Sequence, residues 1–334
     1  MKTFEPSFFD TQNFISEKKE FNYLPAESHN TCHVAFNVTD NFIMMAGVAC
    51  VSVLENNKDM SFVFHIFTDG YSKDSQEKIN ELAKQWQCAC ILYQLNMTPF
   101  EDFHIKVARF SRITYARIYM PKVLKGLTRR FLYMDADTAC MTSLKELFAL
   151  DLGGAPMAAI SEDPHSVEYR SAHLKLKSGK YFNDGVMLID VEEWERQHIT
   201  EQAFSYQCEP KQRFLGQSQD VLNLVFDGQN CFFPSYFVAL GGGEQDKEES
   251  LIVHWTGRDK PWNMVLYEAD RKWRIYNALS PWDTITNILP IKKPENYHDF
   301  RLWGQYQQRH GNTWGHIVGL FWYSWLRMRY KLKL

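Results

Sequence analysis

Asp135-Ala136-Asp137 is the segment of this chain whose residue types and spacing most directly suggest chemistry. It follows residues 130–134, an apolar run with the composition of a strand. Residues two apart on an extended segment project to the same side, so the two carboxylates can converge on one site. Paired carboxylates suit a hard divalent cation, Mg²⁺ or Mn²⁺, whose remaining ligands would be phosphate oxygens. Such a tripeptide also occurs by chance, so the segments around it must show whether it marks a metal site.

A second polar cluster lies far along the chain. His254 follows a short apolar segment that is expected to be a strand, and it precedes a turn through Gly257 that leads to Lys260. A neutral imidazole is a reasonable third ligand beside two carboxylates. Gly257 lets backbone amides approach a phosphate, and Lys260 supplies a compact cation for a diphosphate. The alternative is a buried core histidine and a solvated lysine.

Two further segments could face a sugar. Asn183 and Asp184 precede an expected strand, where they could hydrogen-bond sugar hydroxyls or cap a turn. Gln219 and Asp220 lie at the start of an expected helix with Ser218 as its N-cap, and the helix dipole there favours anions. Helix capping alone is the alternative for this second pair.

The pattern of apolar segments indicates which elements position these residues. Strand-like runs alternate with helical patterns, which is typical of βαβ units and a mostly parallel sheet. Residues 1–30 are expected to be irregular, and residues 239–250 are expected to form a mobile loop. Strands are expected over 33–38, 62–67, 88–95, 130–134, 156–160 and 186–191, and helices over 42–54, 73–87 (capped by Ser72), 114–124, 192–206 and 218–226.

Ligands of parallel sheets bind beyond the carboxyl ends of the strands. Three polar clusters fall at such ends: Thr39-Asp40-Asn41, Thr68-Asp69-Gly70 and Asp135-Ala136-Asp137. They predict one shared site at this edge of the sheet.

The composition sets limits on the class of protein. The 334 residues, 45% of them hydrophobic, suffice for one large α/β domain with an extension or for two smaller domains. The net charge of −3 argues against a nucleic-acid partner. The seven cysteines form no CxxC pair, as expected for reduced cysteines in a cytoplasmic protein. Residues 1–20 lack the apolar core of a signal peptide, and no uninterrupted apolar stretch has membrane-spanning length.

The end of the chain has a different charge balance. From Phe300 to Leu334 there are six of the 37 Lys and Arg residues and none of the 40 Asp and Glu residues. Residues 316–334 mix Trp, Tyr and Phe with these basic side chains. This is typical of an amphipathic helix on an anionic membrane, where each basic residue contributes about 1 kcal/mol. A helix packed on its own domain is the alternative.

Taken together and in order, six segments resemble family 8 of the retaining glycosyltransferases. The resemblance is strongest to the bacterial hexosyltransferases that build the outer core of lipopolysaccharide, and it covers roughly residues 31–265. The segments are AFNVTDNF (35–42), ITYARIYMP (113–121), FLYMDADTAC (131–140), KYFNDGVMLIDVEEW (180–194), QSQDVLN (217–223) and HWTGRDKPWN (254–263).

The resemblance implies a GT-A fold, a UDP-sugar donor, a divalent metal and retention of the anomeric configuration. It implies an N-terminal extension over 1–30, a GT-A domain over 31–285 and a helical, membrane-associating extension over 286–334. The implied acceptor is the lipopolysaccharide core, at the cytoplasmic face of the bacterial inner membrane. By motif, the metal ligands would be Asp135, Asp137 and His254; the nucleotide and donor would contact Asn37, Asp40, Asn41, Arg117 and Ala136; Gly257 and Lys260 would contact the diphosphate; and Asn183, Gln219 and Asp220 would surround the donor sugar.

Retention allows two chemical routes. In one, a carboxylate nucleophile, Asp184 or Asp220, inverts the centre twice. In the other, which is favoured, the acceptor attacks from the face that UDP leaves, the leaving phosphate takes its proton, and Gln219 steadies an oxocarbenium-like centre. Ser218 and Thr39 stand where relatives often have an acid, and Asp184 stands where a small residue is usual. These departures leave the donor, glucose or galactose, open.

Two other functions compete with transfer. A metal-dependent phosphohydrolase of the haloacid-dehalogenase type needs Thr or Val two residues after its second aspartate, and position 139 is Ala. A membrane-docked nucleotide- or carbohydrate-binding module would keep the same binding residues without turnover. The complete set of Asp135, Asp137, His254 and Lys260 favours an enzyme.

Overall fold

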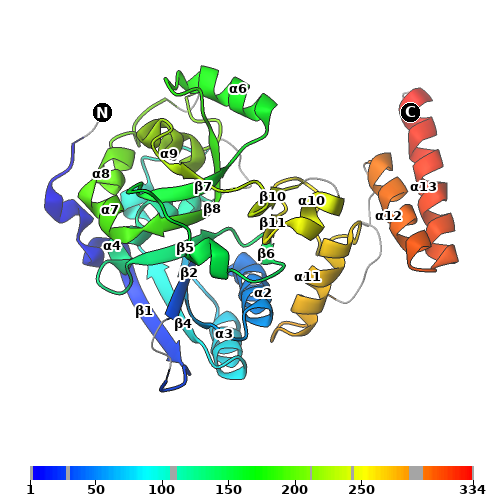
Figure 1. Ribbon diagram of the computed structural model, residues 1–334, viewed down its shortest axis with the longest axis horizontal. Coiled ribbons are helices and arrows are strands. Elements are labelled where there is room, and N and C mark those ends of the chain that lie inside the picture. Colours follow the sequence, from blue (N-terminus) through cyan, green and yellow to red (C-terminus); the bar gives the residue numbers. More distant parts are fainter. Residues whose placement is uncertain are drawn as a thin grey trace.

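An eight-stranded sheet in the order β1-β4-β3-β2-β5-β8-β7-β9 forms the centre of the molecule, with helices around it (Figure 1). The computed structural model describes residues 3–27, 31–105, 111–210, 213–241, 244–285 and 296–332. A second sheet has the order β10-β11-β6. The strands are β1 (Ile15–Asn22), β2 (Thr31–Val38), β3 (Ser61–Thr68), β4 (Ala89–Leu95), β5 (Arg130–Met134), β6 (Thr138–Cys140), β7 (Met157–Ser161), β8 (Phe182–Asp190), β9 (Cys231–Phe232), β10 (Val238–Leu240) and β11 (Ile252–His254).

The predicted mostly parallel arrangement is confirmed at the centre of the large sheet. β2, β3, β4 and β5 run parallel, while β1 and β8 pair antiparallel with β4 and β5. Parallel strands covered on both faces are apolar throughout rather than alternating. In β3, every residue from Phe62 to Thr68 is buried.

Two expectations for irregular segments are wrong. Residues 15–22 form β1, because an edge strand with one face in water tolerates the Lys and Glu residues that made this segment look irregular. The expected mobile loop at 239–250 contains β10, which runs parallel to β11, and a helix, α10 (Glu244–Glu249).

Three other expected elements have different bounds. The expected helix over 192–206 is two helices, because His198 between them has a φ of 55°. The expected helix over 114–124 is a 3₁₀ segment followed by a short α-helix. β8 begins at Phe182, so Asn183 and Asp184 lie within the strand rather than before it.

Besides α10, the described helices are η1 (Pro6–Phe9), α1 (Thr11–Phe14), α2 (Asp40–Asn56), α3 (Lys73–Gln85), η2 (Thr98–Phe100), η3 (Arg112–Ile118), α4 (Met120–Leu124), α5 (Lys145–Phe148), α6 (Pro164–Leu174), α7 (Val191–Arg196), α8 (Ile199–Phe204), α9 (Ser218–Phe226), α11 (Glu268–Ala278), α12 (Tyr297–Arg309) and α13 (Thr313–Leu332).

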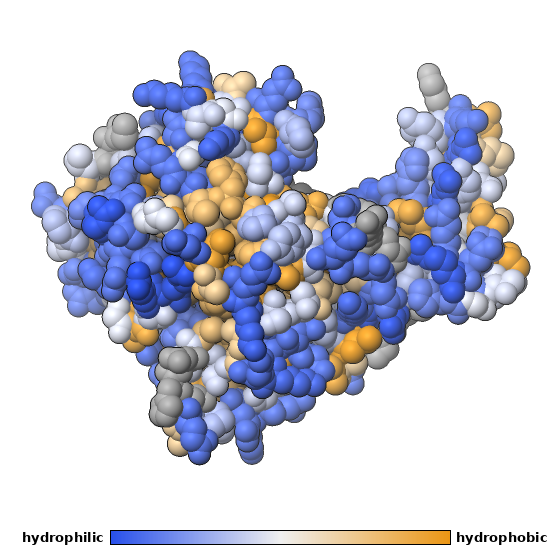
Figure 2. Space-filling model, viewed as in Figure 1, coloured by the Kyte–Doolittle hydropathy of each residue, from blue (hydrophilic) through white to orange (hydrophobic). Residues whose placement is uncertain are grey.

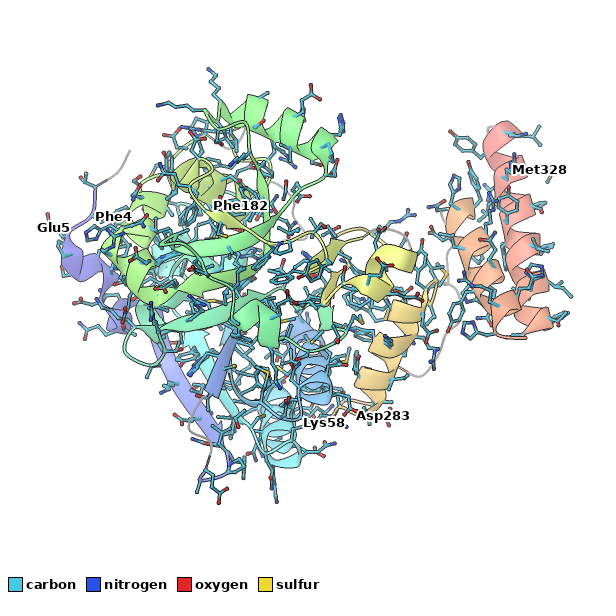
Figure 3. The ribbon with its side chains drawn as sticks, viewed as in Figure 1. Phe4, Glu5, Lys58, Phe182, Asp283 and Met328 are labelled. Carbon is cyan, nitrogen blue, oxygen red and sulfur yellow. The ribbon has the colours of Figure 1, made fainter. Side chains whose placement is uncertain are left out.

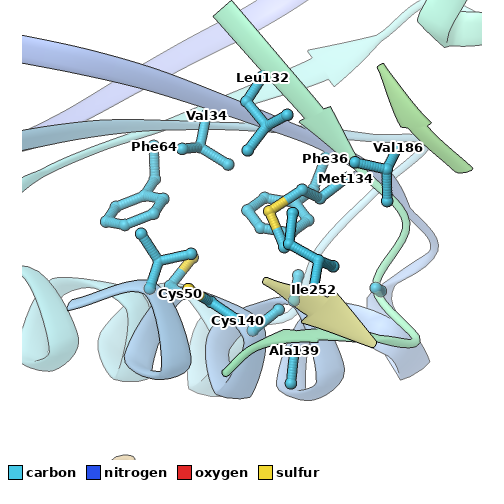
Figure 4. Close-up of a cluster of buried hydrophobic side chains, with 14 of the residues drawn as sticks. Val34, Phe36, Cys50, Phe64, Leu132, Met134, Ala139, Cys140, Val186 and Ile252 are labelled. Carbon is cyan, nitrogen blue, oxygen red and sulfur yellow. The ribbon is translucent and has the colours of Figure 1, made fainter. Parts of the chain in front are cut away.

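Each face of the large sheet buries its own apolar cluster. On one face, Val34 and Leu132 of the sheet pack with Cys50 of α2 and with Cys140 and Ile252 of the small sheet (Figure 4). This packing holds β6 and β11 against the carboxyl end of β5. The turn that joins β5 to β6 is therefore anchored at both ends.

A chain of buried polar groups crosses the same sheet. His33 Nδ1 lies 2.9 Å from His65 Nε2, and His65 Nδ1 lies 3.1 Å from the Tyr93 hydroxyl. Burial lowers the pKa of His33 to about 4 and holds the pKa of His65 well below its ordinary value. Both rings are therefore neutral near pH 7.

Replacing His33 with asparagine is expected to make the fold less sensitive to acid. The pKa of His33 in the folded protein lies below its ordinary value of 6.5, so the unfolded chain takes up a proton first as the pH falls. The contribution of neutral His33 to stability is therefore complete above pH 6.5 and is lost as the pH falls towards 4. Between pH 7 and pH 4.5 the free energy of unfolding should fall by about 2 kcal/mol less in the variant than in the unsubstituted protein. Urea unfolding at both pH values measures this difference, and an equal fall in the two proteins contradicts it.

The last two helices form a hairpin at one side of the molecule. α12 and α13 pack against each other beyond α11 (Figure 1). The helix predicted over 316–334 is confirmed as far as Leu332. Within the described parts of the chain, none of the helices combines the length and apolar character needed to cross a bilayer.

Candidate active site

Asp135 and Asp137 lie in the turn between β5 and β6. The backbone N–H of Asp135 donates to the carbonyl of Gly185 at 2.7 Å, and Thr138 Oγ1 donates to the carbonyl of Asp135 at 2.7 Å. β6 pairs antiparallel with β11 so that Thr138 lies opposite His254. This pairing brings His254 beside the two aspartates.

The two carboxylates and the imidazole form a compact cluster. Their ligand atoms lie within 4.8 Å of one another, and Ala136 is buried between the two aspartates. His254 Nε2 lies 3.2 Å from Asp137 Oδ1 and 3.6 Å from Asp135 Oδ2. Burial lowers the pKa of His254, but the charge and hydrogen bond of Asp137 and the charge of Asp135 together outweigh burial and leave this pKa raised. Burial raises the pKa of Asp137, but His254 and Lys260 outweigh it and hold this pKa well below its ordinary value.

The donor set fits a divalent cation. Carboxylates suit Mg²⁺ and Mn²⁺, and an imidazole is a common further ligand for a transition metal. A Cβ at Gly185 would overlap the His254 ring and would lie 2.8 Å from Asp135 Oδ2, so glycine keeps the cluster open. Among the described residues, His254 Nδ1 is buried without a hydrogen-bond partner. The contacts of Nε2 alone therefore orient the ring towards the carboxylates.

Lys260 adds a second positive charge to the cluster. Its Nζ lies 2.6 Å from Asp137 Oδ2 and also donates to the backbone carbonyl of Trp255. The side chain is partly exposed, so it can reach solvent or a ligand phosphate. Gly257 lies in the same loop, where a Cβ would meet no atom within 4 Å. Its role towards phosphate stays a prediction.

Arg117 links the cluster to β8. Its Nη2 lies 2.8 Å from Asp135 Oδ1, and its Nη1 lies 2.8 Å from Asp184 Oδ1 and donates to the Asp184 carbonyl at 2.9 Å. The side chain is 5% exposed, so the guanidinium lies beneath the cluster rather than at its surface. Tyr133, which sequence reasoning missed, donates to Asp135 Oδ1 at 2.5 Å. Its position two residues before Asp135, on the same side of β5, was the available signal.

Asp184 brings a third carboxylate to this side of the sheet. Ser218 Oγ donates to its Oδ2 at 2.8 Å, while Arg117 pairs with its Oδ1. Burial raises the pKa of Asp184 to about 6, against the attraction of Arg117. The expectation that Ser218 caps α9 is wrong, because Gln217 holds the cap position and makes no side-chain cap bond. Ser218 instead holds Asp184.

Asn183 and Gln219 meet at Glu162, a residue that sequence reasoning missed. Asn183 Nδ2 donates to Glu162 Oε1 at 2.9 Å, and Gln219 Nε2 donates to the same oxygen at 3.1 Å. Glu162 follows β7 directly, and β7 is the neighbour of β8 in the sheet. The pairing of β7 with β8 brings Glu162 to the site, and the sequence alone does not show which strands pair. Gln219 and Glu162 are partly exposed, so this group offers amide and carboxylate atoms to a ligand.

Asp220 is placed differently from its neighbour Gln219. It is 0% exposed, and its oxygens accept hydrogen bonds from the Tyr181 hydroxyl at 2.5 Å and from the Gly216 N–H at 2.6 Å. These bonds fix the chain that precedes α9. Asp220 therefore positions the start of α9, where Ser218 and Gln219 lie.

The residues predicted for the nucleotide are more scattered. Asn37 is buried in β2, where its Oδ1 lies 2.5 Å from the Tyr133 hydroxyl oxygen and its Nδ2 donates to a carbonyl of η3 at 2.7 Å. Asp40 Oδ1 accepts from Ser75 Oγ at 2.6 Å, which ties α2 to α3. Asn41 is exposed in the first turn of α2. Tyr133 thus joins Asn37 to Asp135, while the described contacts of Asp40 lead away from the cluster.

Two hollows lie near these elements. One of about 660 Å³ lies under α6, where Glu162, Val167 and Leu176 contribute to its wall. The other, of about 780 Å³, lies between residues 125–129 and α7. It is at the amino end of β5, opposite to Asp135, so only the hollow beside Glu162 adjoins the residues above.

Comparison with known proteins agrees with this arrangement. Residues 33–265 match the family described as Glycosyl transferase family 8. A lipopolysaccharide 1,2-glucosyltransferase of Escherichia coli strain K12 is 29% identical over 266 residues, which are 75% of this chain and 78% of that protein. A lipopolysaccharide 1,3-galactosyltransferase of Salmonella typhimurium strain LT2 is 25% identical over 296 residues, 84% of this chain and 88% of that protein.

The fold also has solved counterparts. The crystal structure of the galactosyltransferase LgtC in complex with donor and acceptor sugar analogues superposes with a TM-score of 0.65 at 22% identity. The match covers 80% of this chain and 99% of that one, so the predicted GT-A fold is confirmed. Because the family match extends over most of the chain, this protein belongs to glycosyltransferase family 8.

Proposed function

We propose that this protein transfers glucose or galactose from a UDP-sugar to a hexose of the lipopolysaccharide outer core. The anomeric configuration would be retained, and the new linkage would be α-1,2 or α-1,3. The observation that carries the proposal is the cluster of Asp135, Asp137 and His254 with Lys260 beside it, at the carboxyl end of β5. The 1,2-glucosyltransferase and 1,3-galactosyltransferase activities in the names of the relatives supply the substrate class.

The donor diphosphate would lie at this cluster. Asp135, Asp137 and His254 would hold Mg²⁺ or Mn²⁺, and the bound ion would supply positive charge beside the leaving diphosphate. Lys260 now pairs with Asp137. It would turn to the diphosphate when a cation takes its place at that carboxylate, so the charge of Asp137 stays balanced.

The donor sugar would lie between β8 and the start of α9. Asn183, Gln219 and Glu162 offer amide and carboxylate groups to sugar hydroxyls. Asp184 lies next to them, with Ser218 and Arg117 holding its two oxygens. A donor hydroxyl close to Asp184 would compete with Ser218 for the hydrogen bond to the Asp184 carboxylate. We therefore expect the Ser218–Asp184 pair to discriminate between glucose and galactose.

The route in which the acceptor attacks from the face that UDP leaves, called here the front-face route, is supported by the surroundings of the two candidate nucleophiles. Asp220 has no exposed surface, and both oxygens of Asp184 are engaged. On the front-face route no protein group attacks the sugar. The acceptor hydroxyl forms the new bond on the side from which UDP leaves, and a phosphate oxygen of UDP takes its proton. The amide oxygen of Gln219 would steady the positive charge at the sugar.

The acceptor would approach beside Glu162. The hollow under α6 begins there and is large enough for sugar residues. The substrate would be presented at the cytoplasmic face of the inner membrane, to which the C-terminal helices would attach the enzyme as a peripheral protein.

A panel of UDP-glucose, UDP-galactose and their N-acetyl analogues is the direct test. With Mg²⁺ or Mn²⁺ present, one of the two hexose donors should be hydrolysed slowly without acceptor, and EDTA should stop this reaction. Release of UDP measures it. Adding excess Mn²⁺ after EDTA should restore the rate, which separates loss of metal from loss of fold. Undiminished turnover in EDTA would refute the metal role, and no turnover of any donor would refute the proposed function.

A further inference from the structure

Asp135 has one carboxylate oxygen that is already occupied and one that is open. Tyr133 donates to Oδ1 at 2.5 Å, and Nη2 of Arg117 lies 2.8 Å from the same oxygen. A carboxylate oxygen has two lone pairs, so these two donors fill both of them. Oδ2 lies on the other side, 3.6 Å from His254 Nε2. Oδ2 is therefore the oxygen that Asp135 can offer to a cation.

The hydroxyl of Tyr133 has a fixed position. The residue is 0% exposed, and the guanidinium carbon of Arg117 lies 4.6 Å from the centre of its ring. Asn37 Oδ1 lies 2.5 Å from the hydroxyl oxygen, while Asn37 Nδ2 donates to the carbonyl of Ile113 at 2.7 Å. The bond to Ile113 determines which end of the amide faces Tyr133. Packing and polar contacts together therefore hold the hydroxyl beside Asp135.

Two routes of contact lead from η3 to Oδ1 of Asp135. Arg117 reaches this oxygen directly, and Ile113 reaches it through Asn37 of β2 and Tyr133 of β5. In Figure 2, apolar residues gather at the middle of the molecule, where Figure 1 places β5 and β8. Hydrogen bonds are stronger in such surroundings than in water. Asn37, which the family resemblance assigns to the nucleotide, has both side-chain groups engaged inside the protein.

β8 fixes Asp135 from the opposite side. Phe182, labelled in Figure 3, is the first residue of this strand. The backbone N–H of Asp135 donates to the carbonyl of Gly185 at 2.7 Å, and Arg117 Nη1 donates to the carbonyl of Asp184 at 2.9 Å. A rotation that exchanged Oδ1 and Oδ2 of Asp135 would break the contacts of Oδ1. The two oxygens therefore keep separate roles.

We propose that Tyr133, held by Asn37, is a positioning residue that keeps Oδ1 of Asp135 occupied and makes the cluster select Mg²⁺ or Mn²⁺ over Ca²⁺. The proposal rests on the proposed function, which assigns a cation to Asp135, Asp137 and His254. Ca²⁺ takes about six to eight oxygen ligands and often binds both oxygens of a carboxylate, whereas Mg²⁺ requires an octahedron. An aspartate that offers one oxygen withholds a ligand from Ca²⁺ and still suits the smaller ions.

Tyr133→Phe tests the proposal, because it removes the hydroxyl and keeps the ring. Calorimetric titration of Mn²⁺ in the presence of UDP should show an affinity about 10–100-fold below that of the unsubstituted protein, the usual effect of removing the partner of a metal ligand. Ca²⁺, titrated in the same way, should lose less affinity, because the freed lone pair lets Asp135 bind it through both oxygens. The preference for Mn²⁺ over Ca²⁺ should therefore fall by at least about tenfold.

Tyr119→Phe is the matched control. The Tyr119 hydroxyl donates to the carbonyl of Phe9 at 2.7 Å, and the ring is 1% exposed and stacks on Phe14. Both variants lose one hydrogen bond of a buried tyrosine, so both should unfold at slightly lower urea concentrations. Cation binding should change in Tyr133→Phe alone. Equal Mn²⁺ and Ca²⁺ affinities in Tyr133→Phe and in the control overturn the proposal.

Asn37→Ala tests the same contacts from their other end, and its result does not depend on the folding of Tyr133→Phe. It should lower the preference for Mn²⁺ over Ca²⁺ in the same direction but less strongly. Its affinity for UDP in EDTA should equal that of the unsubstituted protein, because Asn37 is buried. A lower affinity for UDP would place Asn37 at the nucleotide. That result, or an unchanged cation preference, overturns the role of Asn37.

Failure of the proposed function gives a different result. If Mn²⁺ with UDP does not bind to the unsubstituted protein, the metal role of the cluster is refuted, and the positioning role of Tyr133 with it. If Mn²⁺ binds equally to the unsubstituted protein and to Tyr133→Phe, only the positioning role is refuted. At saturating Mn²⁺, Tyr133→Phe should hydrolyse the UDP-sugar within about threefold of the normal rate, because the loss lies in cation binding. A rate that stays more than about tenfold lower would place Tyr133 in the chemical step and overturn the proposal.

Discussion

Asp137→Ala is expected to lower UDP-sugar turnover by at least about 10³-fold while the protein stays folded. Asp137 pairs with both His254 and Lys260, at 3.2 Å and 2.6 Å. Its loss removes a cation ligand, and it also removes the partner that keeps Lys260 beside the cluster before a cation binds. Of its two partners, Lys260 is partly exposed and His254 keeps Asp135 as a neighbour at 3.6 Å, so the loss leaves no buried charge unpaired. Rates of UDP release and the circular dichroism spectrum measure the two halves of this expectation.

The matched control for Asp137→Ala is Asp190→Asn. Asp190 lies at the far end of β8, where it caps α7 by accepting from the N–H of Glu193. Its substitution should lower stability slightly, because Arg129 and Arg130 lose a charged neighbour. Turnover should stay within about threefold, because asparagine caps a helix as well as aspartate does. A calorimetric titration of Mn²⁺ in the presence of UDP should show binding to this control and not to Asp137→Ala. Activity within tenfold of normal in Asp137→Ala would show that the cluster is not the site of the leaving diphosphate.

The large sheet could be predicted because its strands carry their own signal. A strand buried on both faces is an unbroken apolar run, so β2, β3, β4 and β5 are visible in the sequence. β1 is not, because an edge strand is stabilised by its partner β4 and keeps its charged side chains in water. β10 is too short to have a period, and its pairing with β11 in the small sheet makes it a strand.

The active site could be predicted only in part, for a similar reason. Asp135 and Asp137 converge because they are two residues apart, which local geometry decides. The contact of Ser218 with Asp184 joins residues that are 34 positions apart, and Glu162 reaches Gln219 across 57 positions. Such contacts follow from the pairing of β7 with β8 and from the place of α9 above it. Both residues of the Ser218–Asp184 pair depart from the family pattern, and the structure places these two departures in direct contact.

Arg117→Ala is expected to lower the free energy of unfolding by about 3–5 kcal/mol, the range typical of a broken buried ion pair. Arg117 is almost fully buried and pairs with Asp135 and Asp184. Without it, two carboxylates face each other with no cation between them. The pKa of Asp184, raised to about 6 by burial, should rise further because Arg117 is the strongest of the groups that oppose burial. A raised folded-state pKa means that stability is lost as the pH rises through it, so the deficit should be larger at pH 7.5 than at pH 5.

A double-mutant cycle separates this explanation from a general loss of packing. Asp184→Asn removes one of the two carboxylates, so Arg117→Ala with Asp184→Asn should recover about 1–3 kcal/mol relative to Arg117→Ala alone. Arg196→Ala is the comparison for losing an arginine, because Arg196 is 67% exposed and pairs at the surface with Glu193. It should change stability little, because exposed ion pairs contribute little. Additive effects of the Arg117 and Asp184 substitutions, or a deficit that does not depend on pH, would mean that Arg117 fills space between η3 and β8 rather than balancing their charges.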